Sequence, residues 1–449
     1  MGLSRRIAGF AADPGPLPDK VRAAGRRAFL NMVGCAIGGA GEAAIDRLVA
    51  LLPAFSGPAT TSLIGRGARA DMLWAACINA AAANIFDYDD THIPTVIHPA
   101  APVGPAVLAL AESLAAEGRP VPGTALIRAF VTGMEVTCRL GLALHPVHYT
   151  RGWHITSTCG TFGAALAAGQ ILGLTEAQMV DAMGHALAQN AGSVETLGTM
   201  SKSLSVGQAA RAGLMGALLA QDGFTGPAAP LEGERGFLAL HSDAPDLAAF
   251  DGLGQRWEVL QNTFKPYPCG VVLNPVIEAC LALHGEGIDA DRIARVTLTG
   301  HPLLRQRTDR PGVETGRLAQ VSAQHAVAVS LLRGEAGLAA FSDAAVAGPL
   351  LRAFGSRLAF CDDPGFALEA AEVTLDLTDG RRITRRVEAA KGGLAHPMTE
   401  ADLAAKLRGQ IRHNGARLDA DALIRALETI EDRDNAADFL ALTRGATGE

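Results

Sequence analysis

The chain has few aromatic residues and few lysines, and its cysteines form no metal-binding pattern. Its 449 residues include three tyrosines, three tryptophans and seven cysteines, and only five of its 39 basic residues are lysines. No two cysteines have the C-x-x-C spacing of a zinc knuckle or an iron–sulfur site, so neither is expected. The odd cysteine number and the absence of a signal peptide pattern predict a reducing, cytoplasmic location.

Motifs of the common nucleotide and hydrolase sites are also missing. The sequence contains no Walker loop, no dinucleotide-binding G-x-G-x-x-G and no G-x-S-x-G elbow. The formal net charge is −7, with no basic block, so nucleic acid is not an expected partner. The 21 residues from Ile155 to Thr175 carry no charge and could span a membrane. Their threonines, Gln170 and several glycines instead favour a buried helix, and no membrane partner is expected.

The first 250 residues are patterned as a series of helices. Apolar residues recur at helical spacing over 19–39, 71–87 and 124–144, and Pro99 opens a further helix. Thr175 is followed three residues later by a glutamine, which is the pattern of a capping box. Abundant glycine and alanine suit helices that pack closely together.

Strand patterns appear between helices after about residue 255. Residues 293–301 resemble a strand, and 372–388 alternate around Asp379-Gly380, which predicts a hairpin. We expect helices near 318–333 and 341–353, and helical spacing returns from Thr399. The sequence therefore predicts a mainly α protein with an α+β second domain. An all-helical domain of residues 1–258 and 396–449 receives an α+β domain of residues 259–395.

A polar segment, NIFDYDDTHIPTVIHP (84–99), follows a very apolar helix. Three carboxylates at a helix C-terminus oppose the helix dipole, so we expect a positive group nearby, either a lysine or a protonated imidazole. The alternative interpretation is a solvated helix end.

The segment HPVHYTRGWHITSTCG (145–160) concentrates histidines beside a tyrosine and a tryptophan. His154 precedes what looks like a helix N-terminus, where backbone N–H groups bind carboxylates. This arrangement would place His154 as an acid or base beside the anion. A capped helix with an incidental histidine is the alternative.

Two of the five lysines lie in segments that could contact an anion. Lys202 stands in the Ser-rich stretch TMSKSLSVG just before a helix, and Lys265 and Tyr267 stand in FKPYPCG, held by two prolines. The second segment lies where the two predicted domains join, and pockets often form at such junctions. A surface lysine is the alternative for each.

In this order the four segments resemble the MmgE/PrpD family, which includes 2-methylcitrate dehydratase, cis-aconitate decarboxylase and iminodisuccinate epimerase. LEGERGF (231–237) and HPMTEADLAAKLR (396–408) extend the resemblance to nearly the whole chain. The resemblance implies an all-helical domain built from both chain ends, an inserted α+β lid and a homodimer. It also implies an active site between the domains that needs no metal and no cofactor.

The resemblance also assigns site residues. The family's motifs fall on Asp87, Thr91 and His98 in D-x-D-D-T…H-P, His154 in G-W-H-x-T with Tyr149 upstream, Lys202 in K-x-L-x-x-G, and Lys265 in K-x-Y-P-C. We expect the two lysines and the N–H groups after His154 to hold a substrate carboxylate. His154 and His98 would carry the proton, with Tyr149 as an acid on the opposite face and Asp87 orienting or balancing an imidazole. Thr91, Thr156, Tyr267 and Asn274 are expected to add substrate contacts.

Two positions depart from the family pattern. Many members have histidine where this chain has Asn274, and many have histidine where it has Ser205. An amide orients a substrate but does not shuttle protons at neutral pH. The chemistry of the decarboxylase and the methylcitrate dehydratase therefore does not carry over whole.

These features predict a cofactor-independent lyase of the dehydratase type that acts on a small di- or tricarboxylic acid. Its central step would be proton transfer at a carbon beside a carboxylate, with cations and N–H groups stabilising the developing charge. One alternative is an epimerase or isomerase of a similar dicarboxylate, which needs bases on both faces of one carbon. Another is a carboxylate-binding protein without catalytic activity.

Overall fold

The computed structural model describes residues 2–445, which form two compact units. Of the described residues, unit 1 contains 2–85, 89–262 and 403–445, and unit 2 contains 86–88 and 263–402. The domain boundaries predicted from the sequence, at 258/259 and 395/396, remain predictions. Each unit is described by itself below.

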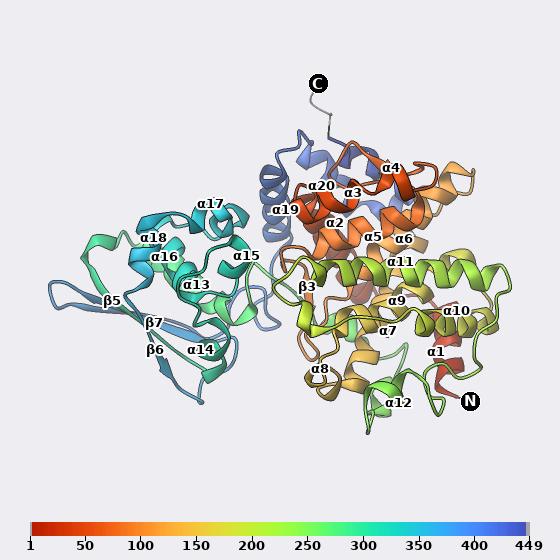
Figure 1. Cartoon of the computed structure of the whole chain (residues 1–449), viewed down its shortest axis with the longest axis horizontal. Helices are drawn as coiled ribbons and strands as arrows, with labels where there is room; N and C mark the ends of the chain where they lie inside the picture. The colour runs from red at the N-terminus through yellow and green to blue at the C-terminus, as the bar shows by residue number, and fades with distance from the viewer. Residues whose placement is uncertain (1, 446–449) are drawn as a thin grey trace. The chain divides into compact units, whose positions relative to one another are not determined.

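Unit 1 is built almost entirely of helices, in agreement with the predicted fold class (Figure 1). From the N-terminal part it takes α1 (Leu3–Ala12), α2 (Asp19–Gly39), α3 (Ala43–Val49), α4 (Leu52–Phe55), α5 (Met72–Asn84), α6 (Ala100–Ala116), α7 (Gly123–Leu144), α8 (Val147–Thr150), α9 (Ile155–Leu172), α10 (Glu176–Ala188), α11 (Ser201–Gln221) and α12 (Phe237–His241). The C-terminal helices α19 (Glu400–Asn414) and α20 (Ala420–Glu428) join the same helical assembly, with α20 packed on α2. Its short strands are β1 (Thr61–Ser62), β2 (Arg69–Ala70) and β3 (Asp90–His92), while β4 (Asn262–Phe264) stands where unit 1 passes into unit 2.

Helix α9 is the centre of unit 1, because α6, α7, α10 and α11 all pack against it. Every residue from 155 to 169 is buried, so the prediction of a buried helix in this uncharged stretch is confirmed. Glycines allow the close approach: a Cβ on Gly163 would lie 2.5 Å from the backbone oxygen of Gly133 in α7, and a Cβ on Gly213 in α11 would lie 2.5 Å from the backbone oxygen of Thr161. A helix that is buried all round needs no polar face.

Several helix starts follow from local sequence. The predicted capping box is present, with the Thr175 hydroxyl accepting from the Gln178 N–H and the Gln178 side chain accepting in return. The Asp71 carboxylate accepts from the Trp74 N–H at the start of α5. Thr399 caps α19 in the same way by accepting from Asp402 N–H.

Unit 2 contains a four-stranded sheet with helices on one face (Figure 1). Its strands are β5 (Ile293–Gly300), β6 (Leu358–Asp362), β7 (Ala371–Leu377) and β8 (Arg382–Val387), in the order β6-β5-β7-β8. β6 runs parallel to β5, and the other neighbours are antiparallel. The predicted hairpin is β7–β8, with Leu375 opposite Ile383 and Gly380 at φ 83° in the turn.

The helices of unit 2 are α13 (Asn274–Gly285), α14 (Pro302–Thr308), α15 (Gly316–Ala319), α16 (Ala323–Arg333), α17 (Asp343–Val346) and α18 (Pro349–Gly355). α13 packs on β7, β8 and α16, and alternate β7 residues are buried in the shared apolar core. The two predicted helices at 318–333 and 341–353 are each broken in the structure. Ser322 starts a new helix by accepting from the His325 N–H, and Pro349 disfavours helical geometry at the residue before it.

No single helix among residues 2–445 is long and apolar enough to cross a membrane. One bent pair, Asp19–Gly39 with Ala43–Phe55 at 85°, reaches that threshold by length and composition only.

Candidate active site

The N-terminus of α9 carries the first group of predicted site residues. His154 is the N-cap residue, as the sequence predicted, and 3% of the residue is exposed. Its backbone N–H donates to the carbonyl of Gly192, which ties this turn to the segment that leads into α11. The first intrahelical bonds are made by the N–H groups of Ser157 and Thr158 to the His154 carbonyl. The N–H groups of Ile155 and Thr156 come before them, at the positive end of the helix dipole.

The His154 ring connects α9 to α11. Its Nδ1 lies 3.0 Å from the Ser157 hydroxyl and 3.1 Å from the Ser205 hydroxyl. Ser205 also donates to the backbone carbonyl of Lys202 at 2.7 Å. The ring is therefore held between the first turns of two helices whose sequence positions lie about fifty residues apart.

Lys202 lies in the first turn of α11 and is buried, with 6% of the residue exposed. Lysine is almost never this deeply buried without a partner for its ammonium group. Lys202 is therefore not a surface lysine, which was the alternative interpretation of its sequence. Its role in substrate binding remains a proposal.

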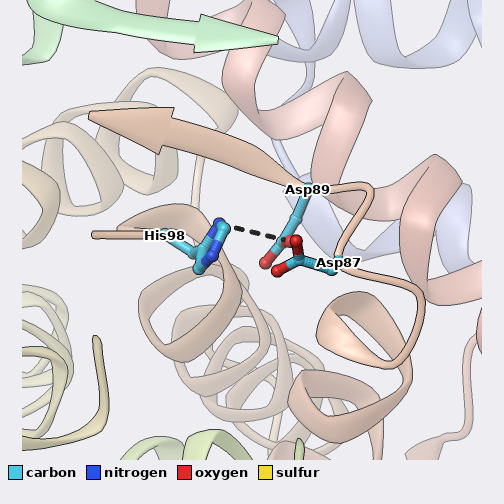
Figure 2. Close-up of side chains that lie close together, drawn as sticks. All are labelled: Asp87, Asp89 and His98. Atoms are coloured by element: carbon cyan, nitrogen blue, oxygen red, sulfur yellow. Dashed lines mark ion pairs between the residues drawn. The ribbon is translucent and has the colours of Figure 1, made fainter. Parts of the chain in front are cut away.

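The polar segment after α5 provides a second histidine. His98 is buried, and its Nδ1 lies 2.7 Å from the backbone carbonyl of Asp90, 3.5 Å from the Thr91 hydroxyl and 3.4 Å from a carboxylate oxygen of Asp89. Figure 2 shows the Asp89 side chain directed at this ring. Asp89 is fully buried and accepts a hydrogen bond from the Asn84 amide at 2.7 Å. A neutral His98 that donates from Nδ1 to the Asp90 carbonyl carries its lone pair on Nε2.

One hydrogen bond joins the His98 segment to α9. The His98 backbone N–H donates to the Thr156 hydroxyl at 3.1 Å, and Thr156 is buried in the first turn of that helix. Thr91, the neighbour of Asp90 on β3, is buried as well. Within unit 1, five predicted site residues from three distant segments thus belong to one connected region: Thr91, His98, His154, Thr156 and Lys202.

Asp90 is a buried carboxyl group beside this region. Burial, together with the neighbouring Asp89 carboxylate, raises the pKa of Asp90 from 3.8 to about 7. Its Oδ2 accepts from the Asn262 amide at 2.7 Å and from the Ala100 N–H at 3.3 Å. The group is therefore poised to hold or release a proton near neutral pH.

Tyr149 lies on the short helix α8 and is half-buried. The same turn carries His148, whose ring is stacked on His241 at 4.9 Å between centroids, with Trp153 packed edge-on against His241. Burial lowers the pKa of His148 to about 3, so this histidine stays neutral and serves packing. These rings fix the turn that leads from Tyr149 to His154.

In unit 2, Asp87 and Lys265 form an ion pair. The Lys265 ammonium is 2.7 Å from an Asp87 carboxylate oxygen and 2.7 Å from the Asp87 backbone carbonyl, and Lys265 is 4% exposed. Asp87 has φ 52°, a conformation that aspartate tolerates better than most residues. The positive group expected beside the aspartates is thus present for Asp87, in the form of a lysine.

Tyr267 and Asn274 are the remaining predicted residues, both in unit 2. Tyr267 is partly buried against the apolar core, and burial raises the pKa of its hydroxyl. Asn274 is the first residue of α13 and accepts from the Cys269 thiol at 3.5 Å. Neither contact indicates a catalytic role, and substrate binding by these two residues remains a proposal.

Sequence reasoning gave no role to several side chains of this region: Asn84, Asp89, Asp90, Ser157 and Asn262. Asp89 and Asp90 lie in the quoted D-Y-D-D-T run, so their residue types offered a signal. Asp89 lies beside His98 because the chain reverses direction between His92 and Ile97, which pair as a β-bridge and bring residue 98 back to the start of β3. The sequence offers no comparable signal for Asn262.

Comparison with protein families matches most of the chain. The MmgE/PrpD N-terminal domain matches residues 5–249, and the MmgE/PrpD C-terminal domain matches residues 267–432.

Individual relatives are similar to this chain over 83% to 96% of its length. Cis-aconitate decarboxylase of Aspergillus terreus is 28% identical over 447 residues, covering 93% of this chain and 91% of the relative. The protein of that name from Mus musculus is 26% identical over 96% of this chain and 90% of its own length. The one from Homo sapiens is 27% identical over 83% of this chain and 79% of its own.

Proposed function

Because the chain belongs to the MmgE/PrpD family, whose two domain models match residues 5–249 and 267–432, we propose that it is a lyase of a small di- or tricarboxylic acid. The reaction would proceed by proton transfer at a carbon beside a carboxylate. One observation carries this proposal. In unit 1 a buried histidine, His98, stands beside a buried carboxylate and is hydrogen-bonded to the same helix N-terminus that bears His154.

His98 is suited to accept the proton. Its Nδ1–H is directed at the Asp90 carbonyl, so its Nε2 is the basic nitrogen of the neutral ring. When Nε2 takes a proton the ring becomes an imidazolium, and the Asp89 carboxylate 3.4 Å from Nδ1 stabilises that charge. An oriented histidine with a buried carboxylate behind it is a common form of general base.

Lys202 and the α9 N-terminus are suited to hold the substrate carboxylate. Removal of a proton from the adjacent carbon places negative charge on that carboxylate in the transition state. A buried ammonium group and the N–H groups of Ile155 and Thr156 would stabilise this charge, each preorganised donor contributing roughly 10²–10³ in rate. Thr91 and Thr156 in unit 1 are further proposed substrate contacts. In unit 2, Lys265, Tyr267 and Asn274 are proposed as substrate contacts, and Asp87 is proposed to orient or balance an imidazole.

The dehydratase form of the reaction is our first proposal. The base removes the proton, the electron pair forms the new C=C bond, and the C–O bond breaks as an acid donates a proton to the departing hydroxyl. His154 or Tyr149 would be that acid. No metal or cofactor is part of the proposal, and the active protein is proposed to be a homodimer.

Decarboxylation is the second candidate, because the relatives described above are named cis-aconitate decarboxylases. In that reaction the C–C bond to one carboxyl group breaks, CO₂ leaves with the bond's electrons left on carbon, and an imidazolium delivers the proton. Epimerisation of a dicarboxylate requires the same proton removal followed by return to the opposite face. A binding protein without activity would hold the same acids unchanged.

A two-step experiment separates these outcomes. A thermal-shift screen of small di- and tricarboxylates first identifies ligands, since a ligand at a hundred times its Kd adds about 2.7 kcal/mol of stability. Each ligand is then incubated with the protein, and alkene absorbance, released CO₂ and recovered configuration are measured. Alkene with no CO₂ supports the dehydratase, CO₂ supports the decarboxylase, and inverted acid alone supports the epimerase. Binding with no product of any kind would refute the lyase.

A further inference from the structure

The turn between His92 and Ile97 sets the position of His98. The Asp89 carboxylate that faces the His98 ring comes before this turn, and His98 directly follows it (Figure 2). The His92 N–H donates to the Ile97 carbonyl at 2.8 Å, and the His92 carbonyl accepts from the Val96 N–H, also at 2.8 Å. Opening of the turn therefore changes the distance between the histidine ring and its carboxylate.

The backbone of Val96 disfavours the closed turn. Its φ is 56°, in the left-handed region that glycine and asparagine adopt far more readily than a β-branched residue. Val96 is 39% exposed, so burial of its side chain offsets only part of this cost. A valine in this conformation disfavours the turn by roughly tenfold relative to an unstrained residue.

Buried contacts hold the other side of the same turn. His92 is fully buried, with its Nδ1 at 2.7 Å from the Thr95 hydroxyl and its Nε2 at 3.4 Å from a carboxylate oxygen of Glu258. Thr95 is fully buried as well. The side chains of Thr95 and Ile97 lie against Gly141 of α7, where they leave no room for a Cβ.

Glu258 is itself fixed to the helices of unit 1. It is 5% exposed, and its other carboxylate oxygen lies 3.2 Å from the Arg256 guanidinium. The next residue, Val259, donates its N–H to the buried Glu135 carboxylate of α7 at 3.1 Å. The hydrogen bond from His92 lowers the pKa of Glu258, so this carboxylate is ionised at neutral pH and accepts from Nε2.

We propose that His92 is a positioning residue for His98. Its contacts with Thr95 and Glu258 keep the turn closed against the unfavourable backbone at Val96, and the closed turn keeps the His98 ring beside its carboxylate. Each buried hydrogen bond is worth roughly fivefold in the opening equilibrium, so the two together are of the size needed to offset the strain. The inference rests on the proposed function only in taking His98 as the base.

Hydrogen exchange measures the opening of the turn without a substrate. Deuterium uptake by peptides spanning residues 90–98 is followed by mass spectrometry in the full-length protein. His92→Phe keeps a flat ring but loses both contacts, and Thr95→Val loses only the contact at Nδ1. The exchange rate of the slowest amides should rise about tenfold in His92→Phe and several-fold in Thr95→Val. Unchanged exchange in both variants would overturn the proposal.

Val96→Gly tests whether the contacts oppose backbone strain. Glycine adopts a φ of 56° at little cost, so His92→Phe/Val96→Gly should exchange at least about threefold more slowly than His92→Phe alone. Ile93→Gly is the matched control, because Ile93 lies in the same turn and is 42% exposed but has no positive φ. It should not slow exchange in the His92→Phe protein. Equal exchange with and without Val96→Gly would refute the role of strain.

Turnover gives a second, separate result. On an acid that the protein converts, His92→Phe should lower kcat at least about tenfold and keep KM within about twofold, because it misplaces the base but not the carboxylate-binding groups. Adding Val96→Gly should restore part of kcat, whereas adding Ile93→Gly should not. Equal kcat in His92→Phe and wild type would refute the positioning role. If no acid is converted, the proposed function fails, but hydrogen exchange still decides whether His92 holds the turn.

Discussion

Asp90 allows a prediction whose size follows from the structure. The pKa of this buried carboxyl is raised from 3.8 to about 7 by burial and by Asp89. Between about pH 4 and about pH 7 the native protein holds a proton that the unfolded chain has already released. The free energy of unfolding therefore falls as pH rises through this window, by about 1.4 kcal/mol per pH unit, and stays lower above it. The total is on the order of 4 kcal/mol.

Asp90→Asn removes this titration while its amide oxygen can still accept from Asn262 and from the Ala100 N–H. We expect the variant to match wild type near pH 4 and to exceed it at pH 8 by up to about 4 kcal/mol. For a unit of roughly 300 residues, with about 2.1 cal/mol/K of unfolding entropy per residue, this corresponds to about 6 °C in Tm.

The measurement is a series of calorimetric Tm values at one-unit pH steps for wild type, Asp90→Asn and a control. Asp222→Asn is the matched control, because it makes the same chemical change at an exposed carboxylate at the end of α11. The Tm difference between Asp90→Asn and wild type should grow with pH, while that of the control should not. A constant difference across the pH range would refute the argument that Asp90 holds a proton at neutral pH.

Three further predictions concern catalysis and packing. His154→Ala and Lys202→Ala should each lower turnover on a converted acid at least about a hundredfold with an unchanged far-UV circular dichroism spectrum; a near-normal rate would remove that residue from the mechanism. Arg139→Ala should lower the free energy of unfolding by about 3–5 kcal/mol, measured by denaturant titration. The substitution leaves Glu135 as an uncompensated buried charge, and four backbone carbonyls lose their hydrogen bonds from the guanidinium group. A decrease of less than about 1 kcal/mol would contradict this prediction. Thr175→Ala should cost about 1 kcal/mol through the lost capping box, and Thr175→Ser should recover most of it.

Much of the fold follows from the sequence because its signals are local. The capping box at Thr175, the hairpin turn at Gly380 and the uncharged run of α9 each depend on residues within a few positions of one another. Strand β6 was not predicted, since its short sequence Leu358–Asp362 pairs in parallel with β5, far away in the chain. The break before Ser322 was also missed, because the helical spacing continues across it.

The site was less predictable, because its geometry depends on contacts between distant segments. His98 and His154 were found from residue type and motif. The carboxylate beside His98 is that of Asp89, which sequence reasoning did not select, and its place depends on the reversal between His92 and Ile97. Ser205 was recognised only as a departure from the family pattern, whereas the structure places its hydroxyl against His154.

Solvent exchange tests the central claim most directly, namely that this chain moves a proton at a carbon beside a carboxylate. The protein is incubated in D₂O with each acid that binds to it, and substrate and product are followed by ¹H NMR, with His98→Gln as the comparison. We predict that wild type removes the proton from that carbon, seen either as product formation or as deuterium at that carbon in recovered acid, and that this rate falls at least about a hundredfold in the variant. Binding of the acids with neither a product nor deuterium at any carbon position would contradict the account.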